Sequence, residues 1–290
     1  MVPAIGCALF AVASSAMAAA PLIWQLEGRS NTVWLMGSIH VLRAADYPLP
    51  DAYHRAYAAA DELLMEIDLD NLDPLEVQRA LSARGAAGRS ESLRGLLGMQ
   101  AHAVAKQKAG ALGIDLEQLD GVEPWYAALT IVQLRLHKLG FDPRFGVDRH
   151  FASRAAADGK RVRGLETFDG QLAILDELSA ALQRDFLIQS LDEAMTMDCV
   201  VESLLDAWKT GDADHLEREL LGSLREYPAL YEALVVRRNR NWIEPILALR
   251  EAPRDVLVIV GALHLIGPDG VIEMLRERGL QVQRLQAVSE

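Results

Sequence analysis

The sequence predicts an α/β fold: a central, largely parallel (mixed) sheet with an N-terminal β-hairpin, flanking helices and helical insertions. Short apolar runs of β-favouring residues alternate with stretches of helical periodicity, which is the pattern of strands joined by helical crossovers. Two of these runs, Thr32 to Met36 and Val256 to Val260, lead directly into Gly-x-x-His sequences. Two long helical stretches, about residues 73–140 and 170–250, interrupt the alternation and predict the insertions.

The first elements are a hairpin, a helix and a strand. Residues Leu22 to Leu26 and Thr32 to Met36 flank the polar turn GRSN, which predicts two antiparallel strands. Asp51 is expected to cap an alanine-rich helix, Ala52 to Ala60. The segment Glu62 to Asp68 (ELLMEID) predicts the next buried strand, with two carboxylates near its end.

The later elements continue the alternation of helices and strands. A helix that ends near Gly159 precedes a short strand, KRVRGLE, which ends at Glu166. The last unit is a strand from Val256 to Val260, a helix that stops at Gly279, and a final strand from Gln281 to Leu285. Strands that alternate in this way with helices favour a largely parallel sheet.

Length and composition limit the possible classes of protein. A chain of 290 residues, 51% of them hydrophobic, can bury a sizeable core, and we expect residues 19–290 to form one α/β domain. The net charge of −12 argues against a nucleic-acid partner, because phosphate binding needs clustered and unopposed Lys and Arg. No stretch has the length of a stable membrane span, and the oligomeric state stays open.

The first twenty residues differ from the rest of the chain, because they carry no charged side chain. The apolar run Ile5 to Ala13 is too short to span a bilayer, and the small-x-small sequence Ala16-Met17-Ala18 follows it. We therefore expect residues 1–18 to be a signal peptide, cleaved after Ala18, and the mature protein to be secreted or periplasmic. Cys199 would then be the one remaining cysteine, so no intramolecular disulfide could form. The alternative is a buried N-terminal helix.

Two distant segments share the Gly-x-x-His pattern: Gly37 with His40, and Gly261 with His264. Each apolar strand would deliver its histidine to the carboxyl edge of the sheet, where open α/β sheets collect functional residues. Two imidazoles presented in this way could bind a metal ion or perform acid–base chemistry. The alternative is a pair of loop histidines that hydrogen-bond to backbone.

Two further predicted strands end in carboxylates, Glu66 and Glu166. Together with His40 and His264 they form a set suited to a divalent transition metal such as Zn, Mn or Co. An open coordination position would hold water and lower its pKa. In a metal-free version, one histidine acts as general base and a carboxylate orients it. Simple solvation of the carboxylates is the remaining alternative.

A basic cluster, VVRRNRNW at Val235 to Trp242, precedes the second Gly-x-x-His strand. An arginine with five fixed donors is suited to hold a carboxylate or to stabilise a developing oxyanion. The alternative is a solvated helix face that pairs with acidic neighbours.

Taken together, these segments resemble the TraB/PrgY/GumN family, which includes the TIKI metalloproteases and is distantly similar to erythromycin esterases and ChaN-like haem-binding proteins. The resemblance spans nearly the whole mature chain in the family's order. It is carried by Leu35 to Pro50 (LMGSIHVLRAADYPLP), Leu63 to Leu69, Gly146 to Phe151 (GVDRHF), Gly159 to Thr167 with Gln171, Arg238 to Trp242 (RNRNW), and Val260 to Val282.

The resemblance implies a metal-dependent peptidase site. The TIKI branch uses both Gly-x-x-His motifs with a glutamate and an arginine, and we expect a divalent metal, Mn, Co or Zn, in this chain. The expected metal ligands are His40, His264 and Glu166, and the expected catalytic residues are Glu66, Glu166, Arg238 and Asn239. One glutamate would take the proton of the attacking water, and the arginine would steady the anionic intermediate or the carboxylate of the substrate.

The predicted function is therefore an exported metal-dependent hydrolase, a peptidase whose substrate is a peptide or another small molecule. One alternative is a periplasmic protein that binds a peptide, haem or a metal without turnover. Another is a metal-independent esterase, by the distant similarity to the erythromycin esterases. The convergence of two histidines, two glutamates and an arginine favours a hydrolase over a pure binding protein.

Overall fold

A computed structural model describes residues 20–69, 71–88 and 91–286, and it confirms the α/β fold class. One mixed sheet has the strand order β4-β3-β5-β2-β1-β6. The six strands are β1 (Ile23–Glu27), β2 (Thr32–Ser38), β3 (Glu62–Met65), β4 (Arg161–Gly164), β5 (Val256–Gly261) and β6 (Val282–Arg284). The expected signal peptide lies outside the described residues and stays a prediction.

The sheet is parallel where the site forms and antiparallel at one side. Strands β2, β5, β3 and β4 run parallel, so their carboxyl ends meet at one edge. The predicted hairpin is present as β1 and β2, and β1 also pairs with β6 in antiparallel fashion. The register places Ser38 beside Gly261, so both Gly-x-x-His segments leave the sheet side by side.

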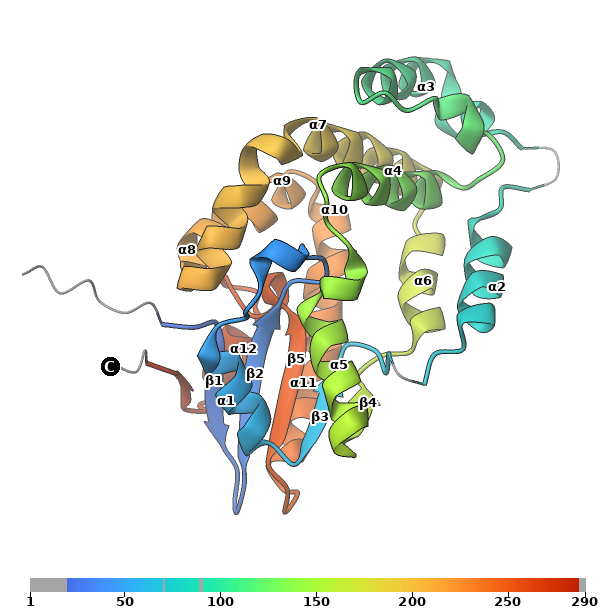
Figure 1. Cartoon of the computed structure of the whole chain (residues 1–290). Coiled ribbons are helices and arrows are strands. Elements are labelled where there is room, and N and C mark those ends of the chain that lie inside the picture. The colour runs from blue at the N-terminus through green and yellow to red at the C-terminus, as the bar shows by residue number, and fades with distance from the viewer. Residues whose placement is uncertain (1–19, 70, 89–90, 287–290) are drawn as a thin grey trace, which may run out of the picture.

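The predicted helical stretches are helical. Figure 1 shows α1 and α5 on one face of the sheet and α11 on the other, with α2, α3, α4, α6 and α7 extending beyond the carboxyl edge of β2. The helices are α1 (Asp51–Ala59), α2 (Pro74–Gly85), α3 (Leu93–Ala111), α4 (Pro124–Lys138), α5 (Val147–Asp158), α6 (Phe168–Asp176), α7 (Ala180–Thr210), α8 (Ala213–Leu216), α9 (Gly222–Arg225), α10 (Pro228–Tyr231), α11 (Arg237–Leu249) and α12 (Val271–Glu277).

Two predicted element boundaries were wrong. Pro50 is the N-cap of α1, and Asp51 is already the first helical residue and makes no capping hydrogen bond from its side chain. There its charge still favours the positive end of the helix dipole. Strand β3 stops at Met65, so Glu66 and Asp68 lie in the segment after it. Because Glu66 lies past the end of the strand, its side chain does not have to point to one of the two faces of the sheet.

The core has two main parts. Strand β5 is buried along its whole length, because helices cover both faces of the sheet. A separate apolar cluster packs α3, α4 and α7 together and includes Leu93, Ile131, Leu187 and Leu191. The helices beyond the sheet therefore bury apolar surface of their own. Within the described parts of the chain, no helix has the length and apolar character needed to cross a membrane.

Asp46 fixes the loop that follows β2 and its histidine. Its side chain is buried, and its carboxylate accepts hydrogen bonds from the backbone N–H of Arg43 (2.8 Å), from Arg43 Nε (3.0 Å) and from Lys209 Nζ (3.2 Å). Burial opposes the charge, but these donors hold the pKa of Asp46 at about 2, below its usual 3.8.

Replacing Asp46 with asparagine is expected to lower the free energy of unfolding by about 2 kcal/mol at neutral pH, because charge-assisted hydrogen bonds are lost. Since the folded-state pKa is depressed, this contribution is present above the unfolded value of 3.8 and disappears as the pH falls through about 2. Urea unfolding of both proteins at neutral and strongly acidic pH measures the difference. We expect that difference to shrink in acid.

Glu202→Gln is the matched control for this variant. Glu202 binds the same Arg43, but its side chain is 63% exposed, and exposed ion pairs contribute little to stability. The control is expected to unfold at the urea concentration of the wild type. An equal loss of stability in both variants would show that the contribution of Asp46 to stability does not depend on the burial of its carboxylate.

Candidate functional site

The carboxyl edge of the parallel strands brings the predicted site residues together. His40 follows β2, Glu66 follows β3, Glu166 follows β4, and His264 ends the short 3₁₀ turn after β5. Arg238 and Asn239 join them from the first turn of α11. All six residues predicted from the sequence belong to one cluster, in which His40 makes an ion-pair contact with Glu66 and the other five are joined by hydrogen bonds.

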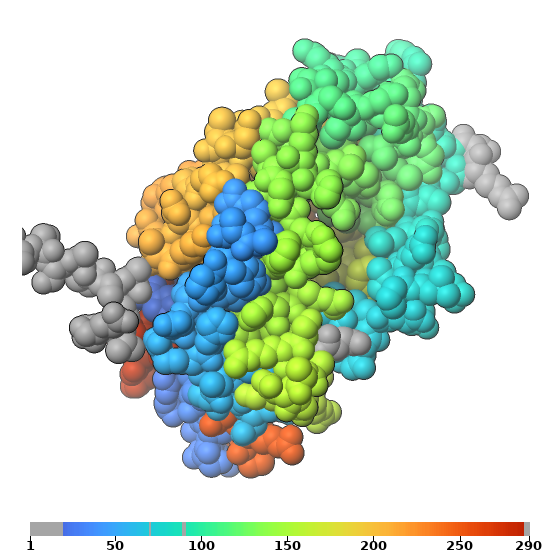
Figure 2. Space-filling view, in the orientation of Figure 1, coloured from blue at the N-terminus to red at the C-terminus, as the bar shows by residue number. Residues whose placement is uncertain are grey.

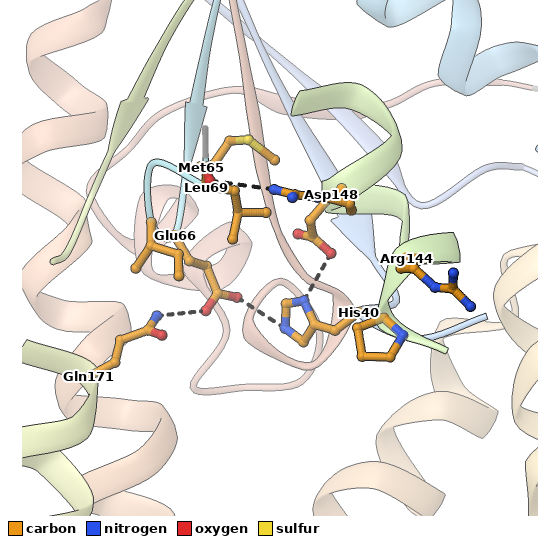
Figure 3. Close-up of a pocket in the computed structure, with 10 residues that line it drawn as sticks. His40, Met65, Glu66, Leu69, Arg144, Asp148 and Gln171 are labelled. Carbon is orange, nitrogen blue, oxygen red and sulfur yellow. Dashed lines mark hydrogen bonds and ion pairs between the residues drawn. The ribbon is translucent and has the colours of Figure 1, made fainter. Parts of the chain in front are cut away.

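His40 lies at the mouth of the cluster between two carboxylates (Figure 3). Its Nδ1 lies 2.8 Å from Asp148 Oδ2, and its Nε2 lies 3.6 Å from Glu66 Oε1. Asp148 also accepts a hydrogen bond of 2.8 Å from Ser38 Oγ, which fixes its carboxylate. The charge of Asp148, followed by that of Glu66, raises the pKa of His40 above its usual value. Because the side chain is 57% exposed, water screens part of this attraction.

His264 is buried and held from the opposite side. Its Nδ1 lies 2.7 Å from Asn239 Oδ1, and Asn239 Nδ2 donates to the carbonyl of Asp269 at 2.8 Å. Because the amide oxygen is the acceptor, the proton sits on Nδ1, and the lone pair on Nε2 can accept a hydrogen bond. Nε2 lies 3.1 Å from Arg238 Nη1. Burial lowers the pKa of His264 to about 3, so its imidazole is neutral.

Arg238 is the centre of the cluster. Its Nη2 donates to Glu66 Oε2 at 2.7 Å and to Glu166 Oε2 at 2.8 Å, and its Nε donates to Glu166 Oε1 at 3.0 Å. Glu166 also accepts hydrogen bonds from Trp242 Nε1 (3.0 Å) and Gln171 Nε2 (2.9 Å). Both oxygens of Glu166 are therefore engaged, and its main contact is the guanidinium that it orients.

Glu66 differs from Glu166 because one of its oxygens faces His40. Oε1 accepts the backbone N–H of Gly261 at 2.7 Å, and Oε2 accepts Gln171 Nε2 at 3.2 Å. Burial opposes its charge, but the charges of His40 and Arg238 and the N–H of Gly261 hold the pKa of Glu66 at about 2. Glu66 is therefore an ionised carboxylate with an oxygen directed toward an imidazole.

Two glycines permit the close approaches that the site needs. A Cβ on Gly146 would lie 2.1 Å from the carbonyl oxygen of His40, so only glycine lets α5 begin against that loop and present Asp148. A Cβ on Gly261 would lie 3.1 Å from His40 Nε2 and 3.3 Å from Glu66 Oε1. The missing side chain at Gly261 thus leaves a small space bordered by His40, Glu66 and His264.

A π-helix, Glu232–Val236, leads into α11, and Arg238 is the second residue of α11. Single π turns inside helices occur frequently at functional sites, because the wider turn re-aims the residues that follow. Arg238 Nη1 lies 3.5 Å from the carbonyl oxygen of Leu234 in this turn. The irregular helix thus helps to place the guanidinium over the carboxyl edge of the sheet.

A pocket of about 490 Å³ opens onto His40 and Glu66. Figure 2 shows the molecular surface hollowed between the lime-green region of α5 and the cyan region of α2. From the two long helical stretches, Gln171 is the residue that lines this pocket. The lining residues are His40, Met65, Glu66, Ile67, Leu69, Pro143, Arg144, Asp148, Arg149 and Gln171.

Sequence reasoning missed two functional contacts. Asp148 was not assigned a role, although it lies in the segment GVDRHF, and that segment was the available signal. Trp242 was named only as the end of the basic cluster; it is buried, and its indole N–H donates to Glu166. Asn239 lies behind His264 rather than in the pocket lining, so its contact with the site is through that imidazole.

The donor groups of the cluster match the chemistry of a divalent metal in part. Both histidines have Nδ1 fixed by an acceptor, which leaves Nε2 for another partner, as in most metal-binding histidines. In the described residues, however, no three His, Cys, Asp or Glu side chains are already grouped as a metal site. The Nε2 of His264 instead lies 3.1 Å from Arg238 Nη1.

The chain is similar in sequence to known proteins. The chain is 26% identical over 247 residues to the "Uncharacterized protein YbaP" of Escherichia coli (strain K12), covering 83% of this chain and 87% of that protein. It is 22% identical over 277 residues to an "Uncharacterized protein" of Treponema pallidum (strain Nichols), covering 89% and 81% respectively. No solved structure matches significantly. A family model matches residues 22–284, and the chain therefore belongs to the TraB/PrgY/gumN family.

Proposed function

We propose that the chain is an exported hydrolase that uses a divalent metal ion, Mn, Co or Zn, to cleave peptides. The observation that carries this proposal is the approach of His40 Nε2, Glu66 Oε1 and the ring of His264 to the empty Cβ position of Gly261, next to an open pocket. Export is proposed from the apolar start of the sequence and its small-x-small site.

His40, His264 and Glu66 would hold the ion. Glu66 takes the place expected for Glu166, because it lines the pocket and directs one oxygen toward His40. Glu166 is instead engaged by Arg238 and its neighbours. To bind the ion, the Nε2 of His264 would have to give up its contact with Arg238.

A bound divalent ion would polarise the scissile carbonyl and lower the pKa of a water molecule. Arg238 supplies a fixed positive charge that stabilises the anion developing on the carbonyl oxygen. Glu166 holds that guanidinium through two parallel N–H···O contacts. Asp148 and Asn239 hold the two imidazoles in orientation and tautomer.

A second candidate is hydrolysis without a metal, with His40 as general base and Asp148 as the carboxylate that orients it. The 2.8 Å contact between the two side chains favours this candidate, as does the contact of Arg238 with the Nε2 of His264. The two candidates use the same pocket and differ in their response to chelation.

Metal content and peptide hydrolysis of the mature chain, purified without chelator or metal resin, test the proposal. We expect near-stoichiometric Mn, Co or Zn, its loss in both His40→Ala and His264→Ala, and loss of hydrolysis on chelation. His137→Ala is the control, because His137 is exposed on α4, away from the site.

The outcomes separate the candidates. Hydrolysis that survives chelation, but not His40→Ala, would support the metal-independent candidate. Absence of metal after reconstitution with each ion, together with no hydrolysis of a peptide library, would contradict both hydrolytic functions. A metal that remains in both variants would place its site away from His40 and His264.

A further inference from the structure

The pocket beside His40 has an apolar wall. Met65, Ile67 and Leu69 come from the end of β3 and the segment after it, and Pro143 adds apolar surface from the short 3₁₀ turn Pro143–Phe145. Apolar walls with a few placed polar groups are typical of ligand sites. An apolar side chain of a ligand would be removed from water here.

The acidic residues that line the pocket are neutralised by partners within the cluster. Glu66 is bound to Arg238 and to the N–H of Gly261, and Asp148 is bound to His40 and Ser38. These carboxylates are therefore not available to cancel the positive charge of other pocket residues.

Two arginines line the pocket, and they differ in their partners. Arg144 donates to Asp142 through Nε (2.9 Å) and Nη2 (2.7 Å), and Figure 3 shows it on the outer side of His40, away from Gln171. Arg149, from α5, is exposed and donates from Nη1 to the carbonyl oxygen of Leu69 at 3.4 Å. No carboxylate among the described residues forms an ion pair with Arg149.

We infer that the pocket takes a ligand with a carboxylate bound by Arg149 and an adjacent apolar side chain packed against Met65, Ile67 and Leu69. A guanidinium matches a carboxylate with two parallel hydrogen bonds. The chain carries a net charge of −12, so an anionic ligand needs such a local cation to bind. Among the residues that the structure describes, Arg149 makes only this one weak hydrogen bond, so its other N–H groups can serve this purpose.

The inference deepens the proposed hydrolase and rests on it for the reaction. In a peptide, the carboxylate is either the C-terminal one or an acidic side chain next to the bond that is cut. Hydrolysis consumes one water: a C–O bond forms and the C–N bond breaks. The leaving nitrogen takes one proton from the attacking water and a second from the new carboxylic acid, which gives a carboxylate and an ammonium group. Arg149 binds one product throughout and takes no part in proton transfer.

Binding of two short peptides, acetyl-Ala-Leu with a free carboxylate and the same peptide as its C-terminal amide, tests the carboxylate. A third ligand, an amidated peptide with Glu beside Leu, tests the acidic side chain as the source. We expect one of the two charged ligands, the free acid or the Glu peptide, to bind about 10-fold more tightly than the neutral amide. Calorimetry on the full mature chain measures the affinities. Added salt should weaken this preference.

Arg149→Gln is expected to remove the preference, and Arg144→Gln is the matched control. Both arginines line the pocket and carry the same charge, but Arg144 is already bound to Asp142. Retention of the preference in Arg149→Gln, or its equal loss in both variants, would overturn the inference. Equal affinity of all three ligands for the wild type would overturn it as well.

The binding measurement also separates this inference from the proposed function. A preference that depends on Arg149 in a protein that cleaves no peptide supports the carboxylate site and contradicts the hydrolase. Cleavage of free and amidated peptides at equal rates supports the hydrolase and contradicts the carboxylate site. Cleavage of the free acid that falls about 10-fold more in Arg149→Gln than in Arg144→Gln supports both.

Discussion

Replacement of Arg238 with methionine is expected to lower the free energy of unfolding by about 3–5 kcal/mol, because it leaves one buried and one largely buried carboxylate without their cation. The side chains of Glu66 and Glu166 are 9% and 14% exposed, and both bind the same Nη2 of Arg238. Methionine fills similar space, so loss of the charge dominates the result. Urea unfolding at neutral pH measures the change.

Arg240→Met is the matched control on the same helix. Arg240 pairs with Glu232, but the two side chains are 59% and 50% exposed, so water replaces the lost contact. The double variant Arg238→Met/Glu166→Gln should regain part of the lost stability, because one of the two like charges is removed. If Arg238→Met were no less stable than Arg240→Met, the buried ion cluster would not be a source of stability.

The loss of stability in Arg238→Met should depend on pH. Without Arg238, the proximity of Glu66 and Glu166 and their burial would raise the pKa of at least one carboxyl group in the folded state. A raised folded-state pKa contributes stability at low pH that is lost as the pH rises through it. The stability difference from the wild type is therefore expected to narrow in acid.

The sequence predicted those parts of the site that local pattern determines. Strands β2 and β5 are apolar runs that end in Gly-x-x-His, and parallel pairing alone brings two such ends to one edge. Glu66 and Glu166 were found in the same way, because each follows a strand. Arg238 stands out by composition, as part of a basic cluster before the last motif.

The roles of these residues depend on tertiary contacts that no local pattern contains. Asp148 meets His40 only because Gly146 lets α5 start against the backbone of that loop. The different environments of Glu66 and Glu166 follow from the position of one guanidinium, which in turn depends on the π turn before α11. Sequence spacing could not have distinguished the two glutamates, because both simply follow short strands.

Gly261→Ala is expected to abolish the proposed metal binding and the proposed hydrolysis while the protein stays folded. Gly261 has φ −52° and ψ 135°, values that alanine adopts without strain, and its N–H would still bind Glu66. The added methyl, however, would lie 3.1 Å from His40 Nε2 and 3.3 Å from Glu66 Oε1. We expect a loss of metal affinity of about 100-fold or more, measured by competition with a chelating dye.

Gly110→Ala in α3 is the control for this substitution, because a Cβ there meets no atom within 4 Å and alanine favours a helix. The control should bind metal as the wild type does. The half-exposed ring of His40 can swing outward to accommodate the new methyl at Gly261, so the unfolding midpoint should change little while the donors separate. Full metal affinity in Gly261→Ala would mean that the ion does not sit between His40 and Glu66. Intact hydrolysis without metal would instead support His40 and Asp148, which lie 2.8 Å apart in the wild type, as the reacting pair.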